Sequence, residues 1–584
     1  MKAMKKFAAA TMAVVMMLSM AACQREPVSG DNPQYDPTKT NVYVMNYDGG
    51  LGQAWLDAAE KRFEEMYKDV ELAEGQKGIN IVIESKNQDG EKVLNNIAGA
   101  KYSVYFTEMV NYNQFVNKGV VMDITDILTE NLTAYGENQS ILDKINSNLS
   151  SFLNVGTEEE PKYYAAPFYE AYSGIMYDVD LFEQKGFYFN AQGQFVQGYF
   201  DDDHIYHGND TLSYGPDGKT GVIDGVDYSG DDGLPATYDQ FFQLCDYMLG
   251  AGVTPLIWPG ANQDYVNELI YNMWADYEGV DRMMLNYTFN GVDDSIVESV
   301  LADGTVVLKD AQNITSENGY LTYGQAGKYY ALQFVERILK GSSAGSYTVS
   351  NIMSSGLTHT DCDTNFLKGP LDTKFETIGM MINGTWFENE ATEAFETLTG
   401  LYGSATSKEN RRIGFMPYPK ATQEQVGDAV TPLCMKSAFC FINANVQDEA
   451  VKTASKMFLQ YVMTDASLKE FQRIVGMPWA LNYEMTAEEL SNCTYYSQSL
   501  YRIHSQDSVV YPYSENNIYV NNTSVFFSNK KLLETKLTNG AVYDIPTTAF
   551  FDKGITAKDY FEGITRNMSE SNWISQFGNY FNGN

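Results

Sequence analysis

NVYVMNYDGGLGQAWLDAAEKRFEE, residues 41–65, contains a strand, a glycine turn and an amphipathic helix in succession. The apolar run at 41–46 has the pattern of a short buried strand, and the turn Asp48-Gly49-Gly50 follows it. From Leu51 to Lys68 the apolar residues recur at helical spacing on one stripe, which places Trp55 in the core. The β-branched run Ile79–Ile83 comes next. A strand, a helix and a second strand joined by a short crossover predict a parallel sheet.

The same kinds of pattern recur along the rest of the chain. Strands predicted at Ser103–Phe106 and Ser437–Asn443 each precede a helical pattern, and Thr237 caps a helix predicted over Tyr238–Leu249. Residues 190–233 are rich in Gly and Asp and are predicted to form a hairpin-like insertion, whereas residues 555–578 are predicted to be helical. These patterns predict an α/β protein with open sheets, whose ligands bind beyond the carboxyl ends of the strands.

The first residues have the composition of an export signal. Lys2, Lys5 and Lys6 precede an apolar stretch over 7–20, which ends in small residues. This stretch is shorter than the roughly 20 apolar residues of a membrane-spanning helix, so we predict a signal peptide over residues 1–22. Residues 23–40 are polar and contain three prolines, and are predicted to form a flexible tether.

The cysteine behind this stretch suggests a lipid anchor. Ala21-Ala22-Cys23 resembles a bacterial lipobox, with Met20 where Leu is usual, and the resemblance implies cleavage before Cys23 and lipidation of its thiol. Two acyl chains on one cysteine anchor a protein firmly, since each buried CH₂ contributes about 0.8 kcal/mol. The alternative is an ordinary cleaved signal followed by an incidental cysteine.

Composition excludes several classes of partner. The formal charge of −36 repels nucleic-acid phosphates and anionic headgroups, so nucleic acid is not expected as a partner. Only four histidines occur, which makes His-based catalysis or zinc binding scarce. Besides Cys23, five cysteines occur without CxxC spacing, and they do not form a disulfide framework. No cofactor or metal is predicted.

Five segments, in this order, resemble extracellular solute-binding proteins of family 1, the maltose-binding-like class. The first is the stretch quoted above, residues 41–65, and the second is YYAAPFYEAYSGIMYDVDLFEQKG, residues 163–186. The third is IGMMINGTWFENE, residues 378–390. The fourth is IGFMPYPK (413–420) with the strand, turn and helix of residues 437–471, and the fifth is VGMPWAL, residues 475–481. The similarity extends over nearly all of residues 41–584, with insertions near 190–235 and 283–320.

The resemblance implies a type II periplasmic-binding-protein-like fold, in which two lobes with open α/β sheets are joined by a hinge of chain crossovers. The N-terminal lobe is then expected to comprise residues 41–165 and about 432–480. The C-terminal lobe is expected to comprise about 166–431 and 481–584. In such proteins ligand contacts from both lobes exist only in the closed form, so a ligand shifts the hinge equilibrium.

The resemblance also implies a function. It predicts a non-enzymatic binding lipoprotein of an ABC importer, which captures a carbohydrate, a neutral oligosaccharide, and delivers it to the permease subunits in the membrane. The protein is expected to be a monomer on the extracellular face of the cell membrane, anchored through Cys23.

Ligand-binding residues are predicted from the needs of sugar recognition, which are flat apolar faces and polar groups for hydroxyls. Three tryptophans in predicted loops meet the first need, whereas Trp55, Trp274 and Trp573 follow helical spacing and are predicted to be core. Acidic, amide and tyrosine side chains at the expected strand ends and crossover meet the second. The predicted site residues are Asp48, Glu108, Tyr169, Glu170, Tyr172, Trp258, Asn262, Asp264, Trp386 and Trp479.

The sequence also contains two patterns that suggest metal binding, and it leaves two alternative functions open. Asp201, His204 and His207 suggest a metal, but they lie in the Gly/Asp-rich insertion, which favours a solvated loop. A calcium loop starting at Asp227 is rejected because Tyr238 stands where a bidentate Glu is needed. A secreted glycoside hydrolase stays open as an alternative, since it needs only a carboxylate pair roughly 5–10 Å apart. A glycan-adhesion lipoprotein without a permease is the other alternative.

Overall fold

The computed structural model describes residues 34–223, 226–522 and 530–581. The predicted signal peptide and Cys23 lie outside these residues, as does the greater part of the predicted tether. Within the described ranges, no helix is long and apolar enough to cross a membrane.

The first sheet has the strand order β4-β1-β5-β19-β6. Its strands are β1 (Thr40–Tyr47), β4 (Ile79–Lys86), β5 (Val104–Thr107), β6 (Ala166–Pro167) and β19 (Phe439–Ile442). The predicted strand–helix–strand unit is confirmed, because β1 pairs in parallel with β4, and helix α2 (Ala54–Met66) lies between these two strands in the chain. Helix α2 begins three residues later than its apolar stripe, after Gly50 and Gly52, which both have positive φ.

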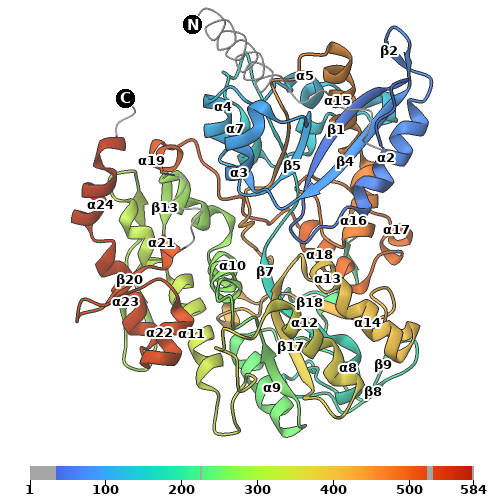
Figure 1. Cartoon of the computed structure of the whole chain (residues 1–584). Helices are drawn as coiled ribbons and strands as arrows, with labels where there is room; N and C mark the ends of the chain where they lie inside the picture. Colours follow the sequence, from blue (N-terminus) through green and yellow to red (C-terminus); the bar gives the residue numbers. More distant parts are fainter. Residues whose placement is uncertain (1–33, 224–225, 523–529, 582–584) are drawn as a thin grey trace, which may run out of the picture.

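The second sheet has the order β12-β17-β7-β18. These strands are β7 (Ser173–Asp178), β12 (Thr254–Ile257), β17 (Ile378–Gly384) and β18 (Ile413–Met416). Figure 1 shows the two sheets in separate lobes, the first at the top and the second below it. Helices α8 (Val179–Lys185), α9 (Tyr238–Gly250), α12 (His359–Lys368) and α14 (Thr392–Tyr402) accompany the lower sheet.

The chain crosses between the sheets three times. Five residues, 168–172, separate β6 from β7, and residues 417–438 lead from β18 back to β19. After α15 (Glu449–Val462) and α16 (Asp465–Val475) the chain returns to the second lobe, where α18 (Tyr495–His504) packs on β18. The predicted lobe boundaries lie at or near these crossings and stay a prediction.

The predicted insertions form hairpins. β8 (Tyr199–Phe200) pairs with β9 (Tyr206–His207), and β10 (Val222–Ile223) pairs with β11 (Val226–Asp227). Between residues 291 and 314, β13 (Gly291–Asp293) pairs with β16 (Gln312–Ile314), and β14 (Val297–Val300) pairs with β15 (Val306–Leu308). The five described cysteines are buried and free.

A further group of helices packs beside the two lobes, on the left of Figure 1. It comprises the later part of α10 (Asp264–Thr288), α11 (Ala326–Lys340), α22 (Pro546–Lys553), α23 (Ala557–Asn567) and α24 (Glu570–Phe577). The last two confirm the helical prediction for residues 555–578. Trp274 and Trp573 are fully buried here, as their helical spacing predicted.

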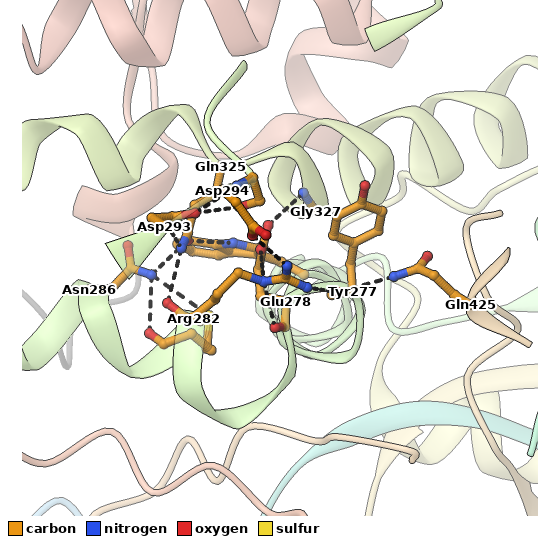
Figure 2. A network of polar contacts seen from close by, with 12 residues as sticks. Tyr277, Glu278, Arg282, Asn286, Asp293, Asp294, Gln325, Gly327 and Gln425 are labelled. Carbon is orange, nitrogen blue, oxygen red and sulfur yellow. Dashed lines mark hydrogen bonds and ion pairs between the residues drawn. The ribbon is translucent and has the colours of Figure 1, made fainter. Parts of the chain in front are cut away.

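A buried polar network holds α10 to α11 and to β13 (Figure 2). Arg282 forms ion pairs with Asp294 at 2.8 Å and with Glu278 at 3.3 Å. Gln325 donates to Asp293 at 2.8 Å and accepts a bond from Asn286 at 2.7 Å. Glu278 Oε1 also accepts a bond from Gly327 N at 2.8 Å, so the network ties α10 to the start of α11. Burial raises the pKa of Glu278 to about 8, which shows that its carboxylate is desolvated here.

The last crossing is fixed to the second lobe through one buried carboxyl. Glu388, in α13 (Phe387–Glu390), is 2% exposed and accepts a bond from Thr494 at 2.8 Å. Gly476 adopts φ +86°, and a Cβ there would lie 2.6 Å from the Glu388 carboxyl. Burial raises the pKa of Glu388 to about 7. The carboxyl therefore keeps its proton in the folded protein at pH values where the unfolded chain has lost it.

This buried acid predicts a pH dependence of stability. Between pH 4.5 and 7, unfolding releases the Glu388 proton, so its contribution to stability is full at low pH and is lost as the pH rises. Glu388→Gln keeps an acceptor for Thr494 without a charge. We expect the variant to gain stability relative to wild type between pH 5 and 8, by at most about 3 kcal/mol. Thermal unfolding of both proteins at pH 5 and at pH 8 checks this. A difference in stability between variant and wild type that is the same at both pH values would contradict it.

Candidate ligand-binding cleft

A hollow of about 880 Å³ lies between the two lobes. The first lobe contributes the turns that follow β1 and β5. The second lobe contributes the start of α10 and the region of α13 and α14, and the crossing segments contribute Tyr169 and Lys436. The residues that line this cleft are Tyr47, Asp48, Gly49, Gly50, Leu51, Gly52, Asn87, Glu108, Met109, Tyr169, Asn262, Asp264, Tyr265, Asn267, Glu268, His359, Trp386, Asn389, Glu390, Thr392 and Lys436.

The first-lobe side of the cleft is built at the carboxyl ends of two strands. β1 and β5 pair in parallel, so Asp48 and Glu108, which follow them, lie at the same edge of the sheet. Asp48 is exposed, whereas Glu108 is buried and accepts a bond from the Tyr169 hydroxyl. Burial and the charge of Glu108 raise the pKa values of Tyr47 and Tyr169. Both hydroxyls therefore stay protonated.

The second-lobe side of the cleft is an aromatic platform with a carboxyl beside it. Trp386 follows β17 and is partly exposed, while the Tyr265 ring meets it edge to face at 6.0 Å between centroids. Glu390 accepts a bond from the Tyr265 hydroxyl at 3.0 Å, and burial raises its pKa. A flat apolar face with a hydrogen-bonding group at its edge suits a ligand with one apolar and one polar surface.

Lys436, in the second crossing, lines the cleft beside Glu268 and Trp386. Its Nζ lies 3.3 Å from Glu268 and 5.5 Å from the centroid of the Trp386 ring. The charge of Glu268 raises the pKa of Lys436 well above its ordinary value. Lys436 is the one lysine or arginine among the described residues that line the cleft, which also holds Asp48, Glu108, Asp264 and Glu390. The cleft is therefore acidic and disfavours anionic ligands.

The two lobes approach each other closely beside Trp386 and Glu390. Gly50 has φ +93°, a conformation that favours glycine. A Cβ at this position would lie 3.6 Å from Trp386 Cβ and 3.6 Å from Glu390 Cγ. The glycine turn of residues 48–50 thus brings first-lobe backbone up to the platform of the second lobe.

The overall structure is similar to several solved structures. RafE in complex with raffinose aligns with 90% of this chain and 98% of its own, at 13% identity and a TM-score of 0.50. A chitin oligosaccharide binding protein aligns at 14% identity and a TM-score of 0.49, covering 91% of this chain and 99% of that one. Maltose-bound MalE3 of T. maritima aligns at 13% identity and 0.48, covering 91% and 99%. No known family profile and no curated protein sequence matches the chain.

The chain has the two-lobe fold of extracellular solute-binding proteins. This confirms the predicted fold class, two open α/β sheets in two lobes joined by chain crossovers. At 13% identity the likeness extends to the fold alone.

The structure brings six of the ten predicted site residues together around the interlobe cleft. Three come from the first-lobe turns and the first crossing, and three from the second lobe. They are Asp48, Glu108, Tyr169, Asn262, Asp264 and Trp386. Their role in ligand binding stays a prediction.

The structure does not bring two of the predicted residues, both in the first crossing, to the cleft, because they are buried and do not line it. Glu170 is 1% exposed and accepts bonds from Tyr511 at 2.6 Å and from His504 Nδ1 at 2.9 Å. Tyr172 is fully buried and packs edge to face on Phe415 at 5.6 Å. Backbone alternation explains the difference, because Tyr169 turns toward the cleft and its neighbour Glu170 turns away from it.

Two of the three predicted loop tryptophans are likewise fully buried and do not line the cleft. Trp479 packs on Trp55, Phe168 and Phe471, and its indole donates to the Pro167 carbonyl at 2.8 Å. Trp258 donates to Gln263 at 3.3 Å. Residues 348–357 cover the Trp258 loop, since a Cβ on Gly260 would lie 2.4 Å from the Ile352 carbonyl oxygen.

Sequence reasoning missed several residues of the cleft. Glu390 lies within the quoted segment 378–390, four residues after Trp386, so helical spacing was a signal for it. Lys436, Glu268 and His359 carry no such local signal, because the fold brings them to the cleft from distant segments.

The suggested metal site is not formed. His207 Nε2 pairs with Asp201 at 2.6 Å, while His204 Nδ1 pairs with Glu183 at 2.9 Å. Among the described residues, no group of His, Cys, Asp and Glu side chains is placed to hold a metal ion.

The burial of Trp258 predicts a stability effect. Trp258→Ala removes a fully buried ring and is expected to destabilise the protein by about 3–5 kcal/mol. Trp386→Ala removes a partly exposed ring and should cost clearly less. Thermal or urea unfolding of the two variants measures the contrast. Equal losses of stability would show that Trp258 is not the core residue described here.

Proposed function

We propose that the chain is the substrate-binding lipoprotein of an ABC importer, and that it captures a neutral oligosaccharide between its lobes. The observation that carries the proposal is the partly exposed Trp386 ring in an acidic interlobe cleft, next to Glu390 and opposite Asp48 and Glu108. Pyranose rings have an apolar C–H face that packs on such a ring, and hydroxyls that donate to carboxylates. RafE, which shares the fold, is a complex with raffinose.

Capture works through the hinge. A ligand that contacts Trp386 on one lobe and Asp48 or Glu108 on the other makes all its contacts only when the lobes are closed. Its differential affinity for the closed form then shifts the population toward closure. A permease reads the closed shape as the occupied state, so binding is coupled to delivery without chemical change of the sugar.

The remaining parts of the proposal rest on the sequence. Cys23, behind its signal peptide, anchors the protein to the extracellular face of the cell membrane by a lipid. The partners are the carbohydrate and the transmembrane subunits of the permease, and the protein acts as a monomer. Nucleic acid is not a partner, because the charge of −36 repels phosphate backbones.

Calorimetry on the soluble chain from residue 24 tests the binding site, with raffinose, maltotetraose and chitotetraose as ligands. Trp386→Ala is expected to weaken binding of the preferred sugar on the order of tenfold to a hundredfold, since an aromatic contact and its buried area are lost. Trp386→Phe should retain much of the affinity. Tyr199→Ala, which removes an exposed ring of the insertion, is the matched control and should bind as wild type.

Two results would contradict the proposal. Unchanged affinity in Trp386→Ala would remove the platform from the site. Release of new reducing ends during incubation with these sugars would identify a glycoside hydrolase instead.

A further inference from the structure

A second hollow, larger than the cleft, lies between the first lobe and the additional helices. It has a volume of about 1140 Å³ and shares no lining residue with the cleft. We call it the α7–α10 groove, after helix α7 (Ser147–Leu153) and the end of α10. Asn154, Gly156 and Glu158, residues 313–317 and 513–516, and Phe581 also line it. Segments that are distant in sequence thus form one polar hollow.

The lining of the groove is uncharged or acidic. Among the described residues that line it there is no lysine, arginine or histidine. Five asparagines contribute, and three of them, Asn148, Asn290 and Asn313, are exposed and make no side-chain hydrogen bond to other described residues. Asn148 lies in α7, Asn290 follows the end of α10, and Asn313 lies in β16. Each offers two donors and an acceptor to a ligand.

Carboxylates and aromatic rings complete the chemistry. Glu158, Glu317 and Glu515 are exposed and form no ion pair with described residues. Phe152 and Tyr513 also belong to the lining, but both are buried and their rings stack on each other at 5.0 Å and 20°. Phe581 is partly buried at the edge. Amides, carboxylates and aromatic carbon together are the groups that hold sugars, whereas an anionic ligand would be repelled.

We infer that the α7–α10 groove is a second saccharide-binding site, distinct from the interlobe cleft. Its ligand is a neutral, polyhydroxylated molecule that hydrogen-bonds to the three asparagines and packs against the partly exposed Phe581 ring. The carboxylates also attract cations. The amides, however, come from three separate elements and are the most numerous polar side chain in the lining, which favours a hydroxyl-rich neutral ligand over a cationic one.

The two sites are separate but linked through the hinge. Helix α10, which is kinked at Gly279, contributes Asp264 to the cleft and Thr288 to the groove. The Tyr513 hydroxyl donates to the backbone carbonyl of Lys436 at 3.3 Å, so the groove and the cleft border the same crossing segment. Variants that test the groove should therefore leave Tyr513 in place.

The experiment is saturation-transfer-difference NMR on the chain from residue 24, with raffinose and maltotetraose as probes. Trp386→Ala weakens the cleft, and the double substitution Asn148→Ala and Asn313→Ala removes two of the groove's asparagines. Both asparagines are exposed, so the double variant is expected to melt as wild type does. Asn290→Leu is a second, independent groove variant.

We expect sugar signal to persist in Trp386→Ala and to weaken on the order of tenfold when the groove substitutions are added. The signal should be unchanged between low and high salt, because the ligand is uncharged. Loss of all signal in Trp386→Ala, or full signal in both groove variants, would overturn the second site while the cleft proposal stands. A salt-sensitive signal that prefers glucosamine to glucose would identify a cation site and also overturn it. Absence of signal from every form would contradict the proposed function itself.

Discussion

The structure depends on backbone hydrogen bonds between the segments that cross from one lobe to the other. Phe168 N donates to the Ala438 carbonyl at 3.1 Å, and Ala480 N donates to the Phe168 carbonyl at 2.9 Å. Cys434 N donates to the Val510 carbonyl at 2.9 Å, which ties the second crossing to the segment after α18. Each lobe also bonds to the crossings, since Leu433 N donates to Asn272 Oδ1 at 2.8 Å and Val110 N donates to the Ser437 carbonyl at 3.0 Å. These bonds form a ladder that satisfies the backbone polar groups of the crossing segments.

The ladder also decides which side chains reach the cleft. Tyr169 and Lys436 point into it from the first and second crossings, whereas Glu170 lies on the buried side and is held by His504 and Tyr511. Trp479 belongs to the third crossing and fills the core beneath the ladder with Trp55 and Phe168. The crossing segments therefore line a polar cleft on one side and pack against an aromatic core on the other.

The sequence predicted the fold well because its signals are local. The strand, glycine turn and helix around Trp55 have their own periodicity, and the structure places them as expected. The site was predicted only in part. Asp48 and Glu108 follow strands and were found for that reason. Trp258 also follows a strand, yet residues 348–357, nearly a hundred positions away, cover it. Coverage by a distant segment leaves no pattern near the residue it buries.

Trp386 and Glu390 line the cleft from one lobe and Asp48 and Glu108 from the other, so under the proposed function one sugar bridges both halves. This bridging is the central claim. Small-angle X-ray scattering of the chain from residue 24, with and without a saturating sugar that calorimetry shows to bind, tests it most directly. The account predicts a smaller radius of gyration when the sugar is bound. Stoichiometric binding with an unchanged radius of gyration would contradict it.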